Sequence, residues 1–377
     1  MVKKGFGLFS VLLFSSLFFA ANLTVWTSWE GEDFFTEIAR LYTQETGIEV
    51  KILHIPKLDD KLFTALRTGN LPDISMVKDV YTERTSISNS LTKLDNTDIE
   101  IVGNFSKESL KPYSSKGSLL AIPYYADVQT VFVNLSLLRS KGVSLDFGYS
   151  IEDIEKISRE FASSEVTPAA WDFMSPYVFY PFLTSFDTLW NEEGKPVFDS
   201  PKIREGITYV KELFDKGVFV RMNRGALVNS FEAGKIAILI QGSYLARDFE
   251  EAGIEFQMLP FPKVKGKKVK PIIDSKGFAI FNAAKKDIAL DFLRFLYSRS
   301  MNYCVEYNKI PLWTQTIPEE LSELYYILKE GQYMYNGLKF QSLYFSTMKT
   351  VLQAVYSGSL SIDEALKSAQ DYVNSNW

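Results

Sequence analysis

Between residues 23 and 55, the sequence passes from a short apolar run through a helical pattern to an alternating run, and this order restricts the fold strongly. Leu23–Trp26 is predicted to be a strand. The next helix is predicted to begin at Gly31-Glu-Asp33, whose acids suit the positive end of a helix dipole, and to end at Thr46-Gly47. Ile48–Ile55 then alternates as a second strand. A strand–helix–strand unit of this length implies a parallel sheet covered by helices.

The alternation of strands and helices continues along the rest of the chain. Further strands are predicted at Asp73–Val77, Val128–Val133, Ile236–Ile240 and Phe278–Phe281. Further helices are predicted at Asp59–Arg67, Leu135–Lys141, Ile151–Phe161, Ile203–Lys216, Val228–Ala233, Ile288–Tyr297 and Ile362–Val373. This pattern favours an α/β fold with doubly wound sheets. Ligands of such sheets bind in the crevice beyond the carboxyl ends of the strands.

The first residues differ from the rest of the chain. Lys3 and Lys4 precede an apolar, uncharged run from Gly5 to Ala20, and Ala20-Ala21 offers small residues for cleavage. Residues 1–21 are therefore predicted to be a secretory signal peptide; an N-terminal anchor that is retained is the alternative. No cysteine follows the run, so no bacterial lipidation site is expected. We expect a soluble chain that is periplasmic or secreted.

Charge and cysteine content narrow the class of protein further. The net charge of −5 argues against a nucleic-acid partner, which would demand clustered Lys and Arg. The one basic run, Lys263–Lys270, is broken by Gly266 and is interpreted as a solvated loop between strands. Cys304 is the only cysteine, so no intramolecular disulfide is possible.

The residues that most enzymes need are scarce in this sequence. The only histidine, His54, lies in an alternating strand, where a structural role is the common one. Zinc sites built from His and Cys are excluded by these counts, and no phosphate loop, dinucleotide fingerprint or nucleophile elbow occurs. We therefore predict no catalytic residue, no metal and no cofactor. A glycosidase that uses two carboxylates stays open, because 46 acidic residues provide many pairs.

One segment points to a known family. Residues 231–244, Phe-Glu-Ala-Gly-Lys-Ile-Ala-Ile-Leu-Ile-Gln-Gly-Ser-Tyr, resemble the signature of the maltose-binding-protein-like group of periplasmic solute-binding proteins (family 1). In that pattern a helix ends at Gly-Lys, a buried strand follows, and a glycine leads to an aromatic residue. The opening strand–helix–strand unit is also similar to the family's. Further segments resemble the family in the same order: Lys57–Phe63, Gly69–Ile74, Ile122–Leu138 and Ser357–Leu366.

The resemblance implies a periplasmic-binding-protein fold, in which two doubly wound α/β lobes are joined by a hinge of several strands and enclose a ligand cleft. It divides the chain into an N-terminal lobe of residues 22–126 plus 277–316 and a C-terminal lobe of residues 127–276 plus 317–377. Such lobes close on a ligand by a hinge motion. The implied partners are a carbohydrate and the membrane permease subunits of an ABC importer, with the chain acting as a monomer.

The resemblance also suggests ligand-binding residues in the first lobe and the hinge. Trp29 is a candidate stacking platform, and Glu30 is either a hydroxyl acceptor or simply an acid at a helix N-terminus. Asp127 is either a ligand contact or a structural hinge carboxylate. The other candidates of this region are Lys57, which is alternatively a solvated helix residue, Lys78, Asp79, Tyr124 and Tyr125.

In the second lobe, the candidates are mostly aromatic, because sugar rings stack on aromatic faces. Tyr177 and Tyr244 match aromatic positions of the maltose binders, and Phe345 aligns approximately with a third. Gly242 would let the backbone approach the ligand. Trp171 and Trp313 are additional candidates in contexts that resemble loops. For each aromatic residue, a place in the hydrophobic core is the alternative.

Three functions are therefore compared. The leading hypothesis is a binding protein that delivers a neutral carbohydrate, in particular an oligosaccharide, to an ABC importer. A binder of a charged solute, such as a sugar acid, a sugar phosphate or a polyamine, is the second, and Lys57 and Lys78 favour its anionic forms. The third is a secreted glycoside hydrolase that would use Asp127 with another acid.

Overall fold

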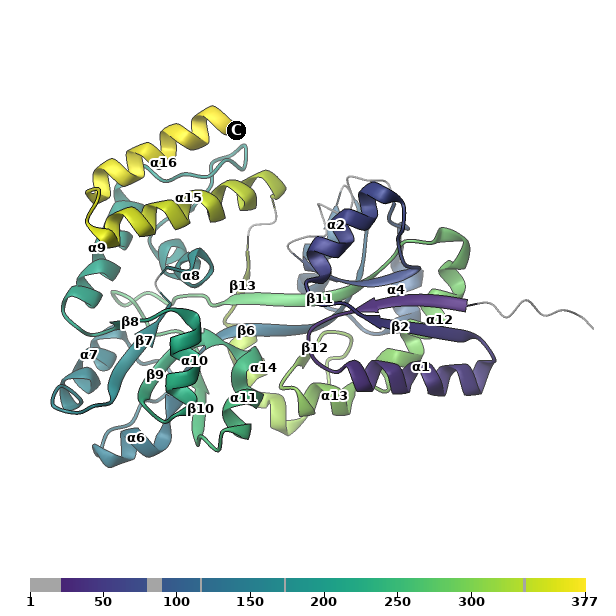
Figure 1. Cartoon of the computed structure of the whole chain (residues 1–377), viewed down its shortest axis with the longest axis horizontal. Helices are drawn as coiled ribbons and strands as arrows, with labels where there is room; N and C mark the ends of the chain where they lie inside the picture. The colour runs from purple at the N-terminus through teal and green to yellow at the C-terminus, as the bar shows by residue number, and fades with distance from the viewer. Residues whose placement is uncertain (1–21, 80–89, 116, 173, 335–336) are drawn as a thin grey trace, which may run out of the picture.

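The protein consists of two lobes that share one mixed β-sheet (Figure 1). The computed structural model describes residues 22–79, 90–115, 117–172, 174–334 and 337–377, so the predicted signal peptide lies outside the described residues. Within them, the strand order of the main path is β2-β1-β3-β11-β6-β9-β7-β8. The strands β10 and β12 pair with β6, and β13 pairs with β11.

The first lobe begins with the strand–helix–strand unit that the sequence predicts. Its elements are β1 (Asn22–Thr27), α1 (Glu32–Thr46), β2 (Glu49–His54), α2 (Leu58–Thr68) and β3 (Ile74–Lys78). The strand β1 pairs in parallel with both β2 and β3. Gly47 and Gly69 end the two helices in the left-handed conformation, which glycine adopts without steric cost. The predicted bounds of all five elements are confirmed to within two residues.

Two long strands join the lobes, β6 (Ile122–Asn134) and β11 (Ile272–Ile280). They pair antiparallel to each other, and β11 is also antiparallel to β3. The parallel sheet expected from the sequence is therefore interrupted at the crossing. Beyond Val128, β6 changes partner and pairs with β9 (Ile236–Gly242) and β10 (Phe256–Leu259) of the second lobe. Both crossing strands begin six residues before the predicted ones, because the apolar pattern is interrupted by polar residues at the crossing.

The second lobe packs helices around β9, β7 (Thr167–Trp171) and β8 (Val220–Arg221), which run parallel to one another. Its helices are α6 (Leu135–Ser140), α7 (Ile151–Glu160), α8 (Pro176–Phe186), α9 (Pro201–Asp215), α10 (Arg224–Glu232), α11 (Ala246–Glu251), α14 (Ser322–Lys329), α15 (Leu338–Ser357) and α16 (Ile362–Asn376). The basic run Lys263–Lys270 lies in the connection between β10 and β11, as predicted.

The remaining described elements belong to the first lobe or to the crossing. They are α4 (Asn96–Val102), α5 (Lys107–Leu110), β4 (Ser114–Ser115), β5 (Ser118–Leu119), α12 (Lys286–Ser298), α13 (Met301–Glu306), β12 (Ile310–Pro311) and β13 (Gln332–Tyr333), with short 3-10 turns at Lys111–Tyr113 and Ala283–Lys285. Two further 3-10 turns, Ser243–Leu245 and Glu319–Leu321, lie in the second lobe. None of the helices in the described ranges combines the length and the hydrophobicity that a membrane crossing needs.

Two hydrophobic clusters stabilise this arrangement. One surrounds the first-lobe strands and continues past Phe132 of β6 into the second lobe, where it includes Phe231 and Phe249. The other lies in the second lobe around Trp171 and Phe182. Along β6, Phe132 belongs to the first cluster while Val131 and Val133 belong to the second. Successive strand residues point to opposite faces, so β6 separates the two cores. The second lobe therefore contributes to both clusters, one on each face of β6.

Candidate ligand-binding cleft

A cavity of about 700 Å³ lies between the two lobes, against the strands that join them. Its first wall is formed by the ends of β1 and β3, its floor by β6 and β11, and its second wall by segments of the second lobe. The first wall contributes Trp29, Glu30, Lys78 and Asp79; the floor contributes Asp127, Ile272, Ile273, Asp274 and Lys276; the second wall contributes Tyr177, Arg224, Tyr244, Met334, Gln341, Ser342, Phe345 and Ser346. This volume is in the range of small-molecule sites.

The Trp29 side chain lies at the carboxyl end of β1, in a loop with unusual backbone geometry. Trp29 itself has φ 66°, in the left-handed region that non-glycine residues rarely adopt. Its indole lies 5.5 Å from the ammonium of Lys78 and 5.7 Å from that of Lys276, measured to the ring centroid. Lys78 also pairs with Asp59 at 3.7 Å. The loop therefore holds a large aromatic face at the cleft beside two cations.

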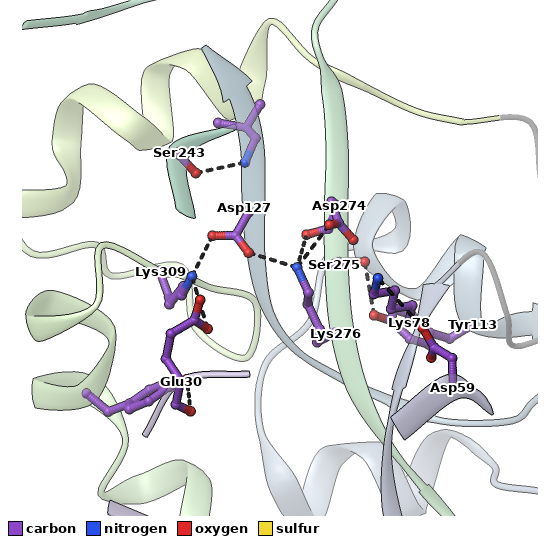
Figure 2. Close-up of polar contacts among 12 residues, drawn as sticks. Glu30, Asp59, Lys78, Tyr113, Asp127, Ser243, Asp274, Ser275, Lys276 and Lys309 are labelled. Atoms are coloured by element: carbon purple, nitrogen blue, oxygen red, sulfur yellow. Dashed lines mark hydrogen bonds and ion pairs between the residues drawn. The ribbon is translucent and has the colours of Figure 1, made fainter. Parts of the chain in front are cut away.

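Five charged side chains form a continuous ion network across the cleft floor (Figure 2): Glu30, Lys309, Asp127, Lys276 and Asp274. Asp127 lies at the centre. Its Oδ2 accepts a hydrogen bond from Lys276 Nζ at 2.8 Å, and its Oδ1 accepts one from Lys309 Nζ at 2.9 Å. Lys276 also pairs with Asp274 at 3.1 Å, and Lys309 pairs with Glu30 at 3.5 Å. Positive and negative groups alternate along the whole network.

Burial of this network decreases from its centre to its ends. The side chains of Asp127, Lys276 and Lys309 are 3%, 4% and 1% exposed, whereas those of Asp274 and Glu30 are 23% and 34% exposed. The two end carboxylates thus reach the cleft, and each is held by a buried ammonium. Carboxylates fixed in this way are acceptors suited to ligand hydroxyl groups.

The pKa values of the central pair indicate that both groups are charged. Burial alone would raise the pKa of the Asp127 carboxyl, but the adjacent Lys276 and Lys309 outweigh it and lower this pKa below its ordinary value. Burial likewise opposes the charge of Lys276, yet Asp127 and Asp274 raise its pKa. Proton transfer within the network is therefore not expected near neutral pH.

Tyr125 packs against the two lysines of the ion network. It is fully buried, and the ammonium groups of Lys276 and Lys309 lie 5.6 and 5.5 Å from its ring centroid. A ring face attracts a cation electrostatically, so Tyr125 helps to hold both lysines in position. Its side chain does not line the cleft.

The second wall is largely aromatic. Tyr177 lies in the first turn of α8, Tyr244 follows β9, and Phe345 lies on α15. Burial raises the pKa of both tyrosine hydroxyls, so they stay protonated and can donate hydrogen bonds. Arg224, at the start of α10, lies with its guanidinium 5.3 Å from the Tyr244 ring centroid. Among the described residues, Arg224 forms no ion pair.

Gly242 has a different role from the predicted one. It does not line the cavity. A Cβ atom added to it would lie 2.1 Å from Cε1 of Tyr244, so the tyrosine ring occupies the space that any other residue would fill. Tyr244 Oη also donates a hydrogen bond to Gln241 Oε1 at 3.2 Å. The glycine therefore allows Tyr244 to lie flat against the end of β9.

The cleft brings together eight of the fourteen residues proposed from the sequence: Trp29, Glu30, Lys78, Asp79, Asp127, Tyr177, Tyr244 and Phe345. The other six lie elsewhere. Lys57 is an exposed residue that precedes α2, whereas Tyr125 and Gly242 are buried and do not line the cavity.

The remaining three are core residues. Tyr124 is fully buried, stacks on Trp313 at 5.3 Å, and donates a hydrogen bond to Ser300. Trp171 was expected in a context that resembles a loop, but it is the last residue of the strand β7, and its ring stacks on Phe182 with the centroids 4.2 Å apart. Large aromatic side chains are mostly buried, and here that alternative is the one that the structure has.

Sequence reasoning missed several polar residues of the site. Asp274 and Lys276 are two residues apart in a strand that begins and ends with apolar residues, and this spacing places both side chains on one face of the strand. The spacing was a usable signal. Arg224, Gln341 and Lys309 gave no such signal. Lys309 in particular reaches Asp127 from a turn far away in sequence.

No group of three or more His, Cys, Asp or Glu side chains in the described ranges is arranged to hold a metal ion. A two-lobed α/β protein with a small-molecule cleft at the strands between its lobes has the architecture of a solute-binding protein. The profile of the bacterial extracellular solute-binding protein family matches residues 37–309. The chain therefore belongs to this family.

The chain is also similar, at low sequence identity, to curated solute-binding proteins. The chain is 22% identical over 315 residues to a maltooligosaccharide ABC transporter solute-binding lipoprotein of Streptococcus pneumoniae, which covers 78% of this chain and 73% of the relative. It is 20% identical over 303 residues to a galactooligosaccharide-binding protein of Bacillus subtilis, which covers 77% and 71%. The predicted family resemblance is thus confirmed.

Proposed function

We propose that this protein captures a neutral oligosaccharide by closure of its lobes and delivers it to an ABC importer. The observation that carries the proposal is the composition of the cleft. Aromatic side chains from both lobes face a floor of carboxylates that are already paired with lysines. Aromatic rings suit the C–H faces of sugars, and the end carboxylates suit their hydroxyl groups. The names of the two relatives, one for maltooligosaccharides and one for galactooligosaccharides, support this ligand class.

The charges of the cleft favour a neutral ligand over a charged one. Lys276 lies between Asp127 and Asp274, and Lys309 lies between Asp127 and Glu30, so each buried cation is matched by acids. An anionic ligand would have to compete with these acids, and a polyamine would have to compete with the lysines. Arg224 and Lys78 line the cleft and favour a sugar acid, but the Arg224 side chain is exposed and Lys78 pairs with Asp59 at 3.7 Å.

The same network argues against a glycoside hydrolase that uses Asp127. A general acid in such an enzyme needs a raised pKa so that it carries a proton at neutral pH. Burial is outweighed by two lysines at Asp127, and its pKa is lowered. Asp127 is therefore unsuited to protonate a leaving group. The proposed role of the protein is binding without turnover.

For lobe closure, we propose the division predicted from the sequence, with residues 22–126 plus 277–316 in one lobe and residues 127–276 plus 317–377 in the other. The crossing strands β6 and β11 would act as the hinge. Ligand would favour the closed state because it contacts both walls only there. We further propose that the chain is exported, acts as a monomer, and presents its closed form to the permease subunits.

Calorimetric titration of the purified protein tests the ligand class. The panel consists of maltotriose, maltoheptaose, galactooligosaccharides, an oligogalacturonate and spermidine, each at low and high salt. A neutral oligosaccharide should bind with an affinity that salt leaves unchanged, and it should be recovered intact. It should also reduce the radius of gyration in X-ray scattering. Cells that lack the protein should lose uptake of the labelled sugar.

Two neighbouring acids give a matched pair of variants. Glu30→Gln should weaken sugar binding about tenfold, because the end carboxylate loses a charge-assisted hydrogen bond. Glu32→Gln changes an exposed acid in the first turn of α1, outside the cleft, and should keep full affinity. Salt-sensitive binding of the oligogalacturonate alone would move the assignment to an anionic solute, and hydrolysed product would contradict the proposal.

A further inference from the structure

A second cavity, of about 340 Å³, lies in the seam between α15 and α16 in the second lobe. The two helices run antiparallel and side by side at the outer surface of this lobe (Figure 1). We name this cavity the α15–α16 groove. The residues used below to describe it are Ser346, Thr347, Thr350, Leu360, Ser368 and Tyr372.

The groove adjoins the ligand-binding cleft. Ser346 lines both cavities. On α15, Ser342 and Phe345 face the cleft, and two exposed residues further along the same helix, Ser346 and Thr350, line the groove. Residues four apart lie one above the other on a helix surface, so Ser346 and Thr350 form a low rim of small side chains. A ligand that extended out of the cleft past Ser346 would therefore lie next to the groove.

The chemistry of the groove matches that of a neutral sugar. None of its lining residues carries a charge. Tyr372 and Leu360 line the groove and are 51% and 40% exposed, so both present apolar surface there, and Tyr372 contributes an aromatic ring. Ser346, Thr350 and Ser368 add hydroxyl groups that both donate and accept hydrogen bonds.

A buried hydroxyl in the groove lacks a partner. Thr347 lines the groove and is 5% exposed, and its Oγ1 makes no hydrogen bond within the described residues. Most buried polar side-chain atoms have a partner, so an unpaired hydroxyl beside a cavity points to a ligand that supplies one.

We propose that the α15–α16 groove is an accessory subsite for a long oligosaccharide. One end of the ligand occupies the cleft, the chain crosses the rim at Ser346, and a distal sugar ring stacks on Tyr372. The groove adds about half of the cleft volume to the site. The inference rests on the proposed function, because it concerns the same ligand. It assigns to this face a preference for chain length, which the cleft alone would not provide.

Titration calorimetry with a short and a long sugar of one series separates the two sites. Tyr372→Ala should weaken binding of maltoheptaose by roughly three- to tenfold, as expected for the loss of one aromatic contact. It should leave maltotriose unchanged, and galactooligosaccharides of different length should show the same pattern. Thr350→Trp, which fills the groove from its exposed rim, should reproduce this loss for the long sugar only.

Tyr326→Ala is the matched control. Tyr326 lies on α14, is 48% exposed, and contacts Phe147 instead of a cavity of the site. This variant should bind both sugars as the unchanged protein does. The melting temperature of each free variant shows whether its fold is intact.

Each other outcome identifies which proposal fails. If Tyr372→Ala and Thr350→Trp bind short and long sugars as the unchanged protein does, the groove proposal is overturned and the proposed function stands. The groove proposal is also overturned if the affinity for both sugars falls equally. It is overturned as well if the variants bind both sugars normally but fail in uptake, because the groove would then serve the transport partner. If the unchanged protein binds no sugar of either series, the proposed function itself is wrong.

Discussion

Replacing Lys309 by methionine would remove one cation from the centre of the ion network while keeping most of the side-chain volume. The Lys309 side chain is 1% exposed and contacts Asp127 at 2.9 Å and Glu30 at 3.5 Å. After the change, the Asp127 carboxylate remains 3% exposed and keeps only Lys276. Glu30 is 34% exposed and can be hydrated instead. The cost therefore falls mainly on Asp127.

The size of this cost follows from the burial of the remaining charge. Breaking a buried ion pair by removing one partner costs about 3–5 kcal/mol, because the other charge stays buried. We expect the lower end, about 3 kcal/mol, since Lys276 still offsets part of the Asp127 charge. Folded domains are stable by about 5–15 kcal/mol, so the variant should fold but unfold at clearly lower denaturant concentration.

Urea unfolding at neutral pH, followed by tryptophan fluorescence, measures this change. The control is Lys367→Met, which breaks a lysine–aspartate pair of the same 2.9 Å length whose side chains are 72% and 63% exposed. Exposed pairs contribute little, so the control should unfold as the unchanged protein does. Equal unfolding curves for the two variants would refute the reasoning, because burial would then have no effect on the cost.

Three further predictions concern pH, packing and reactivity. Burial opposes the charge of Asp127, but the two lysines outweigh burial and lower the Asp127 pKa in the folded state. The stability that the Asp127 carboxylate provides is therefore present above its unfolded pKa of about 4 and is lost as the pH falls through the lower folded pKa. The difference in melting temperature between the unchanged protein and Asp127→Asn should therefore shrink below about pH 4. Gly242→Ala should displace the Tyr244 ring and weaken sugar binding by up to about tenfold in titrations, whereas Gly225→Ala, whose Cβ meets only ordinary contacts, should not. Burial raises the pKa of the Cys304 thiol, so it should react with a thiol reagent only in urea.

The extent to which the fold follows from the sequence differs between its parts. In α1, apolar residues recur at helical spacing and Gly47 marks the end, so local pattern alone predicts the bounds. β6 is buried along its whole length, and its polar residues Asp127 and Gln129 interrupt the apolar run that a strand prediction follows. They are satisfied by distant partners, Lys309 and Ile272, which no local pattern contains.

The same distinction applies to the site. Residues at the carboxyl ends of strands, such as Trp29 and Asp79, could be predicted because the position of a strand end fixes where its next residues lie. Tyr124, Trp171 and Trp313 were proposed on residue type, and type does not distinguish a sugar platform from a core residue. Only the packing of the two lobes determines whether such an aromatic residue lies at the cleft or in the core.

The alternation of charge in the network bears directly on how the lobes can close. Closing a cleft removes water from every charged group at its surface, and an isolated charge would make that costly. Here Asp127, Lys276 and Lys309 are already buried in the structure described, so their desolvation is complete before a ligand arrives. Only the outer edges of Glu30 and Asp274 remain to lose water, and sugar hydroxyl groups can replace it with hydrogen bonds. We infer that the buried lysines make the acceptors both rigid and inexpensive to enclose, which favours closure on a ligand rich in hydroxyl groups over closure on an empty cleft.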